Sequence, residues 1–240
     1  MSASADRCLE LVRRADKDRY LASLFAPDAR RPALMALYAF NIEIARVRGQ
    51  VSEPAIGEIR YQWWRDAIAG IYEGVTQAHP VVQELARAIE TGHLSKEPFL
   101  NLIAAREFDL YDDPMPDVSA LEGYLGETSS ALVQMASLVL AGAEARASAN
   151  AAGLAGVAYG ISRLLYERKF MPQGLDAIAH ARARLAEARA LHHTITPESF
   201  PAFLPVSLTE LYLNRAAKFV EVSQLRRQWR LWRAARRETF

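Results

Sequence analysis

The sequence has a single cysteine, Cys8, among its 240 residues. One thiol excludes an internal disulfide and supplies at most one ligand to a metal ion, which fits a reducing compartment. Cys8 has no histidine near it in the sequence and stands close to a terminus that we expect to be mobile. We therefore predict no catalytic thiol at this position.

Long apolar runs are missing as well. A membrane-spanning helix needs roughly 18 apolar residues, and the longest candidate, 131–143, is shorter and contains Gln134. The first 14 residues have no continuous apolar stretch and include Asp6 and Glu10, so they predict neither a signal peptide nor a transit peptide. These absences favour a soluble, cytoplasmic protein.

Charge of one sign does not dominate, because 29 Lys and Arg residues stand against 28 Asp and Glu residues. Such a balance provides no overall electrostatic reason for nucleic-acid binding, and we predict no nucleic-acid partner. The alternation of apolar and polar residues that marks β-strands is also absent, as are internal repeats and low-complexity tails. The sequence therefore predicts an all-α protein, and its length suits one domain over residues 1–240.

The chain is organised around the stretch 18–64, and within it around 38–48, which we interpret as one long buried helix. Its apolar residues recur at helical spacing, Pro32 stands just inside the start, and Gly49 is a plausible end. The apolar residues are Leu34, Leu37, Tyr38, Ala39, Ile42, Ile44 and Ala45. Because the helix is apolar on most sides, we expect it at the centre of a bundle, with Asn41, Glu43 and Arg46 facing a cavity or solvent.

Further helices are predicted on both sides of this core element. We expect them over residues 5–25, 54–74, 80–91, 96–110, 120–141, 149–166, 175–194 and 208–238. Two prolines break the helix in 109–117, and 200–205 is predicted as a turn between prolines.

Several motifs together resemble the squalene/phytoene synthase family. They are Tyr20–Pro27, Arg30-Arg31, Ala36–Phe40, Gln62–Arg65, Arg106–Leu110, Tyr124–Ser130, Gly156–Ser162 and Phe170–Pro172. Because they occur in the family's order along most of the chain, the resemblance implies an isoprenoid-synthase-like helical bundle around a central cavity. We name Tyr38, Asn41, Tyr124 and Tyr159 as candidates to line it.

The carboxylates on which the family's catalysis depends are missing. Members that condense two prenyl diphosphates resemble one another in two aspartate-rich motifs, whose carboxylates hold the Mg²⁺ that bridges the departing diphosphate. The resemblance implies that the first motif would fall at Ala45, Arg46 and Gly49, and the second near Glu167. We therefore predict no catalytic residue, no metal site and no cofactor, with Mg²⁺ required only if the chain is a divergent transferase.

Other acidic and histidine pairs are weak metal candidates. Asp113 and Asp117 have the DxxxD spacing, but two prolines between them forbid the helical turn that would bring the carboxylates together. We expect a solvated loop there, and a surface acid at Asp109. The adjacent His192 and His193 point in different directions from a helix and have no third ligand at a suitable spacing, so we expect them to complement a helix C-terminus.

Cations stand where the acids are lost. Arg46, Arg163, Arg168 and Lys169 are therefore candidates to bind an anionic or diphosphate head group directly through charge-assisted hydrogen bonds. The alternative is that they are solvated or paired with neighbouring glutamates.

The C-terminal stretch 225–237 carries six arginines, with Leu225, Trp229 and Trp232 at helical spacing. Such a basic amphipathic helix is typical of a peripheral contact with an anionic membrane. Arg226, Trp229, Trp232 and Arg233 are the membrane-contact candidates. The alternative is that the tryptophans pack on the bundle.

Three further segments resemble a branch of the family that lacks the aspartate motifs and is associated with assembly of respiratory complex I. They are Phe200–Pro205, Ile42–Ala45 and Ser52–Gly57. The resemblance implies a non-catalytic assembly or scaffolding factor with a protein partner, peripheral at the inner membrane. The alternatives are a divergent prenyl-diphosphate transferase and a carrier for an isoprenoid or a lipid with a phosphorylated head.

Overall fold

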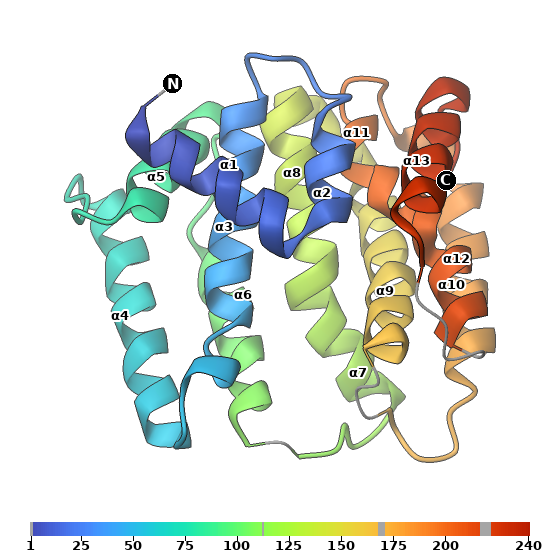
Figure 1. Cartoon of the computed structure of the whole chain (residues 1–240), viewed down its shortest axis with the longest axis horizontal. Coiled ribbons are helices and arrows are strands. Elements are labelled where there is room, and N and C mark those ends of the chain that lie inside the picture. The colour runs from blue at the N-terminus through green and yellow to red at the C-terminus, as the bar shows by residue number, and fades with distance from the viewer. Residues whose placement is uncertain (1, 112, 168–170, 217–221) are drawn as a thin grey trace.

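The computed structural model describes residues 2–111, 113–167, 171–216 and 222–240, and within these ranges it is a helical bundle without strands (Figure 1). The helices are α1 (Ala3–Ala15), α2 (Lys17–Ser23), α3 (Arg31–Ala45), α4 (Pro54–Tyr72), α5 (Pro80–Gly92), α6 (Glu97–Glu107), α7 (Val118–Leu125), α8 (Ala131–Ala141), α9 (Ala149–Tyr166), α10 (Ala177–Ala190), α11 (Phe200–Phe203), α12 (Thr209–Ala216) and α13 (Gln224–Arg237). The predicted all-α bundle is confirmed.

Helix α3 lies in the core, as its apolar pattern predicts. Eleven of its 15 residues are buried, and it packs against α1, α5 and α8. The helix is shorter than predicted, because it ends at Ala45 and a 3-10 turn at Arg48–Gln50 follows. Residues of the last turn of α3, Ile42 and Ala45, line the cavity described in the next section.

Helices α7 and α8 do not form the single regular helix that was predicted. A π-helical segment, Gly126–Ser130, joins them. At this point α9 comes unusually close: a Cβ on Gly156 would lie 2.3 Å from the Ser130 Cα and 2.6 Å from its backbone nitrogen. The small residues of α9 permit this approach, and the π-helical segment turns Thr128 and Ser129 toward the cavity.

Two predictions near the ends of the chain are wrong. Residues 200–205 form not a turn but a short helix, α11, which continues into a 3-10 turn at Leu204–Leu208, and all nine residues from 200 to 208 are buried. Cys8 is not at a mobile end, because α1 places it fully in the core. Burial, with smaller effects from Glu84 and Glu43, raises the pKa of the Cys8 thiol to about 12.

Helices α4 and α13 lie at opposite edges of the bundle (Figure 1). Helix α13 packs against the 3-10 turn at Leu204–Leu208 and against α2. Within the described ranges, no helix combines the length and the hydropathy needed to cross a bilayer.

Candidate functional site

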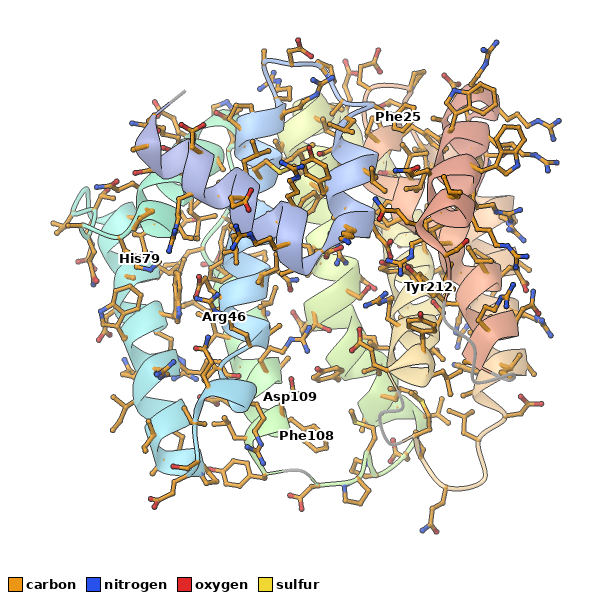
Figure 2. All side chains as sticks on the ribbon, viewed as in Figure 1. Phe25, Arg46, His79, Phe108, Asp109 and Tyr212 are labelled. Atoms are coloured by element: carbon orange, nitrogen blue, oxygen red, sulfur yellow. The ribbon has the colours of Figure 1, made fainter. Side chains whose placement is uncertain are left out.

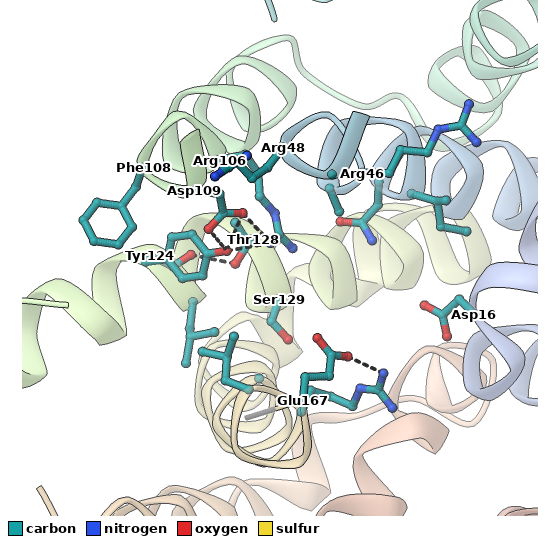
Figure 3. A pocket seen from close by; sticks show the side chains of 18 of the residues that line it. Asp16, Arg46, Arg48, Arg106, Phe108, Asp109, Tyr124, Thr128, Ser129 and Glu167 are labelled. Carbon is teal, nitrogen blue, oxygen red and sulfur yellow. Dashed lines mark hydrogen bonds and ion pairs between the residues drawn. The ribbon is translucent and has the colours of Figure 1, made fainter. Parts of the chain in front are cut away.

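A cavity of about 1020 Å³ lies between the end of α3, the end of α6, the π-helical segment and α9 (Figure 3). The junction of α1 and α2 closes another side with Asp16 and Arg19. The walls combine apolar side chains with a dense set of charged ones. The apolar contributions come from Ile42, Phe108, Met115, Leu125 and Leu164.

One wall carries a cluster of Arg106, Asp109 and Tyr124. The Arg106 Nη1 donates to the Tyr124 hydroxyl at 2.5 Å and to the Asp109 carboxylate at 3.1 Å. The Tyr124 hydroxyl in turn donates to Asp109 at 3.0 Å (Figure 3). Burial raises the pKa of Tyr124, Arg106 opposes the rise and Asp109 adds to it, so the phenol is a neutral donor. The predicted surface acid Asp109 is thus part of the cavity wall, because a 3-10 turn at Phe108–Leu110 follows α6 and points it inward.

The facing wall is built from α2 and α9. Arg163 pairs with Glu167 at 2.5 Å, one helical turn later, and its Nη1 lies 3.6 Å from Asp18. Arg19 pairs with Asp16 at 2.6 Å, and its guanidinium lies 5.5 Å from the centre of the Tyr159 ring. Each of these carboxylates is therefore already matched by an arginine.

Asp18 is the residue that sequence reasoning missed. Its side chain is 2% exposed, and it accepts hydrogen bonds from the hydroxyls of Tyr159, at 3.1 Å, and Tyr212. Arg163 and Arg227 each approach it to 3.6 Å. Burial and the charge of Asp18 raise the pKa of Tyr212, which keeps this phenol a hydrogen-bond donor. No local pattern marks Asp18, since an aspartate near a helix start is ordinarily exposed.

Two of the four predicted anion-binding residues lie at the cavity, and the other two are not described by the structure. Arg46 lines the cavity and pairs with Glu43 at 2.6 Å, while Arg163 lines it from the opposite wall. Arg168 and Lys169 lie outside the described residues. Both described arginines are paired, which agrees with the alternative that neighbouring glutamates neutralise them.

Three of the four predicted lining residues, Asn41, Tyr124 and Tyr159, do line the cavity. Tyr38 does not. It is buried in the core under Arg19, whose guanidinium lies 5.8 Å from the centre of its ring, because the side of α3 on which it stands packs against other helices.

Arg46 and His79, both labelled in Figure 2, line a second, smaller cavity of about 430 Å³ together with Glu43. Burial lowers the pKa of His79, Glu43 opposes this and Arg46 adds to it. The Arg46–Glu43 pair thus stands at the boundary between the two cavities.

The site does not fit a magnesium ion. Ala45, Arg46 and Gly49, the positions that the family resemblance assigns to the first aspartate motif, all line the cavity, and none is acidic. Across the described ranges, no group of three or more His, Cys, Asp or Glu side chains is arranged to hold a metal. The loop from Asp113 to Asp117 is not helical where it is described, so these two carboxylates do not share a helix face.

The membrane-contact candidates lie on α13, away from the cavity. Trp229 is 62% exposed and Trp232 is 44% exposed, and Arg226 and Arg233 are exposed beside them. The alternative, in which the tryptophans pack on the bundle, is wrong, because Leu231 and Ala234 take that role. His193, at the end of α10, lies 3.2 Å from the Ala190 carbonyl through its Nδ1, as expected for a residue that completes a helix C-terminus.

The sequence profile of the squalene/phytoene synthase family matches residues 12–169 of this chain. The fold is similar to a squalene synthase from Alicyclobacillus acidocaldarius, with a TM-score of 0.76 and 17% identity over 90% of this chain and 94% of that one. A dehydrosqualene synthase, crystallised with a ligand, has a TM-score of 0.78 and 16% identity over 98% and 96% of the two chains. At these identities the likeness concerns the fold alone.

The sequence is more similar to proteins of another description. "NADH dehydrogenase (ubiquinone) complex I, assembly factor 6" from Homo sapiens is 30% identical over 87% of this chain and 72% of its own length. The protein of the same description from Bos taurus is 31% identical over 89% and 74% of the two chains.

Proposed function

Because the chain belongs to the squalene/phytoene synthase family, we propose that it uses this fold without the chemistry, as a non-catalytic assembly factor for a respiratory NADH dehydrogenase complex. The observation that carries the proposal is that Ala45, Arg46 and Gly49 face the cavity where the family's acids would stand. Of the carboxylates that do line the cavity, Asp16, Asp109 and Glu167 each pair with an arginine. Without a cluster of free carboxylates among the described residues to hold Mg²⁺, a diphosphate remains a poor leaving group. The relatives described as assembly factors support the same role.

The proposal is tested in cells from which this protein has been removed. We expect the assembled NADH dehydrogenase to be lost from native gels and restored when the chain is returned. We also expect the purified protein, given farnesyl diphosphate and Mg²⁺, to form no condensed product. Normal assembly in the absence of the protein, or product formation by it, would contradict the proposal and favour the prenyl transferase.

We further propose that the cavity holds the head group of an anionic isoprenoid or lipid directly on its arginines. Arg163 and Arg46 come from opposite walls, and apolar side chains such as Ile42 and Leu164 also line the cavity. A phosphate accepts bidentate hydrogen bonds from a guanidinium and competes with the glutamate that now pairs with each arginine. The apolar lining suits the chain of the ligand.

Calorimetric titration with farnesyl diphosphate tests the ligand class. We expect equal binding in Mg²⁺ and in EDTA, and a loss of about tenfold or more in affinity for Arg163→Gln. Arg65→Gln is the matched control, because Arg65 also pairs with a glutamate, Glu107, but does not line the cavity. Binding that requires Mg²⁺, or an equal loss in both variants, would contradict direct recognition by the cavity arginines.

We propose that the protein is cytoplasmic and binds peripherally to the surface of the inner membrane. The exposure of Arg226, Trp229, Trp232 and Arg233 supports this location. An assembly factor in this position meets membrane-embedded partners without spanning the membrane itself.

A further inference from the structure

The six arginines of helix α13 fall into two groups, two that contact the bundle and four that are exposed. Arg227 turns inward, where its Nη1 lies 3.6 Å from Asp18 and its Nη2 donates to the Val222 carbonyl at 3.1 Å. The Arg230 Nε donates to the Ser207 carbonyl at 3.0 Å. The four other arginines, Arg226, Arg233, Arg236 and Arg237, are exposed. The inward pair therefore holds the helix while the outward group faces solvent.

The outward face is also aromatic. The indole rings of Trp229 and Trp232 stack with their centres 5.2 Å apart, and the guanidinium of Arg236 lies 5.3 Å from the Trp232 ring. Leu225, one turn before Trp229, is 78% exposed. Because Leu231 and Ala234 already fill the side toward the bundle, this face remains exposed in the part of the chain that the structure describes.

The positive charge of this face favours one kind of binding partner. Helix α13 holds six of the chain's 29 Lys and Arg residues and none of its 28 acids, so the remainder of the chain carries more acids than bases. A nucleic acid that extends beyond α13 would therefore gain no overall electrostatic attraction from the rest of the chain. A flat anionic bilayer touches one face only, and it gains from arginines in the head-group layer and indole rings at the interface.

The opposite edge of the bundle offers a contrast. Helix α4 also exposes apolar side chains, Ile59 and Trp63 among them, but its charged residues are matched by near neighbours. Arg65 pairs with Glu107, and Asp66 accepts from Gln62 at 2.8 Å. Exposure of apolar side chains alone therefore does not distinguish α13. Its four exposed arginines do, because among the described residues no acidic side chain pairs with them.

We propose that the outward face of α13, formed by Leu225, Trp229, Trp232 and the four exposed arginines, is a preformed binding surface for anionic phospholipid bilayers. The inference deepens the proposed peripheral membrane contact, and it does not depend on the assembly role. Because the helix is already folded and docked on the bundle, binding does not have to pay for helix formation. The helix lies parallel to the membrane plane, with its tryptophans toward the acyl boundary.

Co-sedimentation of the purified full chain with vesicles tests this surface. We expect binding to vesicles of phosphatidylcholine mixed with phosphatidylglycerol, weak or no binding to phosphatidylcholine alone, and loss of binding at high salt. Arg226→Gln with Arg233→Gln is expected to lower the partition coefficient about 30-fold. Trp229→Ala with Trp232→Ala is expected to lower it at least about tenfold.

Matched controls remove the same groups elsewhere. Arg13→Gln with Arg60→Gln deletes two exposed arginines from α1 and α4, and Trp63→Ala deletes a partly exposed tryptophan from α4. Both controls should bind anionic vesicles as the unmodified chain does, and circular dichroism should show that every variant is folded.

Three results would overturn the inference. The first is equal binding to neutral and anionic vesicles, or to neither. The second is an equal effect of the α13 variants and their controls. The third is displacement from vesicles by duplex DNA at matched phosphate concentration, which would identify a general polyanion surface. Because the assay contains no respiratory complex, its failure would leave the assembly role to be judged by the cell experiment.

Discussion

Arg227 reaches from α13 to within 3.6 Å of Asp18, at the start of α2. The contact joins two helices that are about 200 residues apart in the sequence, and the same carboxylate lies 3.6 Å from Arg163 in the cavity wall. Asp18 is therefore shared by helix α13 and the candidate ligand site. A buried carboxylate of this kind is costly to leave without its partners and costly to remove.

We expect Asp18→Asn to lower the free energy of unfolding by about 3 kcal/mol, because two arginines would lose the charge that matches them inside the protein. Urea denaturation followed by circular dichroism measures the change. Asp28→Asn is the matched control: Asp28 also pairs with an arginine, Arg31, at 2.9 Å, but its side chain is 90% exposed. The control should change stability by less than about 0.5 kcal/mol. Equal effects would show that burial of Asp18 is not what matters.

We expect Gly156→Ala to destabilise the fold by about 1 to 3 kcal/mol, since the new methyl group would collide with the backbone of Ser130 in the π-helical segment. Gly153→Ala, one turn earlier in α9, is the control, because its Cβ would meet nothing within 4 Å. Alanine favours a helix over glycine by up to about 1 kcal/mol, so the control should be neutral or stabilising. Thermal unfolding of the two variants would decide, and a stable Gly156→Ala protein would rule out the close approach.

Stability should fall at alkaline pH partly through Cys8. Burial raises the pKa of its thiol from 9.0 to about 12, so the unfolded chain releases the proton at lower pH than the folded one. The contribution of Cys8 is complete below pH 9.0 and is lost between pH 9.0 and about 12, with a slope of about 1.4 kcal/mol per pH unit. Urea denaturation at several pH values should show a shallower decline for Cys8→Ala, and an unchanged slope would contradict the buried thiol.

Introducing two aspartates at the positions of the first aspartate motif should not produce Mg²⁺ binding. We expect Ala45→Asp with Gly49→Asp to bind no Mg²⁺ in calorimetry, because Arg46 stands between the two positions and the facing wall pairs its own Glu167 with Arg163. Gly49 has open space for a side chain, so the variant should fold. Gain of Mg²⁺ binding would reveal that enough of a catalytic ligand set survives, and would revive the transferase.

Much of the fold could be predicted from residue patterns. The apolar run of α3 indicated a buried helix, and α9 begins and ends at the predicted residues, Ala149 and Tyr166. The absence of acids at the aligned positions was equally readable. These features depend on local spacing and on residue identity, and neither changes when the chain folds.

What the sequence by itself determined was thus an all-α bundle of this family without its metal-binding acids, and a basic, tryptophan-bearing helix at 225–237. The tertiary structure decided which side chains are buried and which face the cavity. In the sequence, Asp18 and Asp109 resemble ordinary acids near helix ends. Only the packing of neighbouring helices buries Asp18 and places Asp109 in the cavity wall. The two faces of α13 both carry apolar residues, and only packing chose Leu231 for the core and left Trp229 exposed, because periodicity defines the faces of a helix but not the surface against which each one packs.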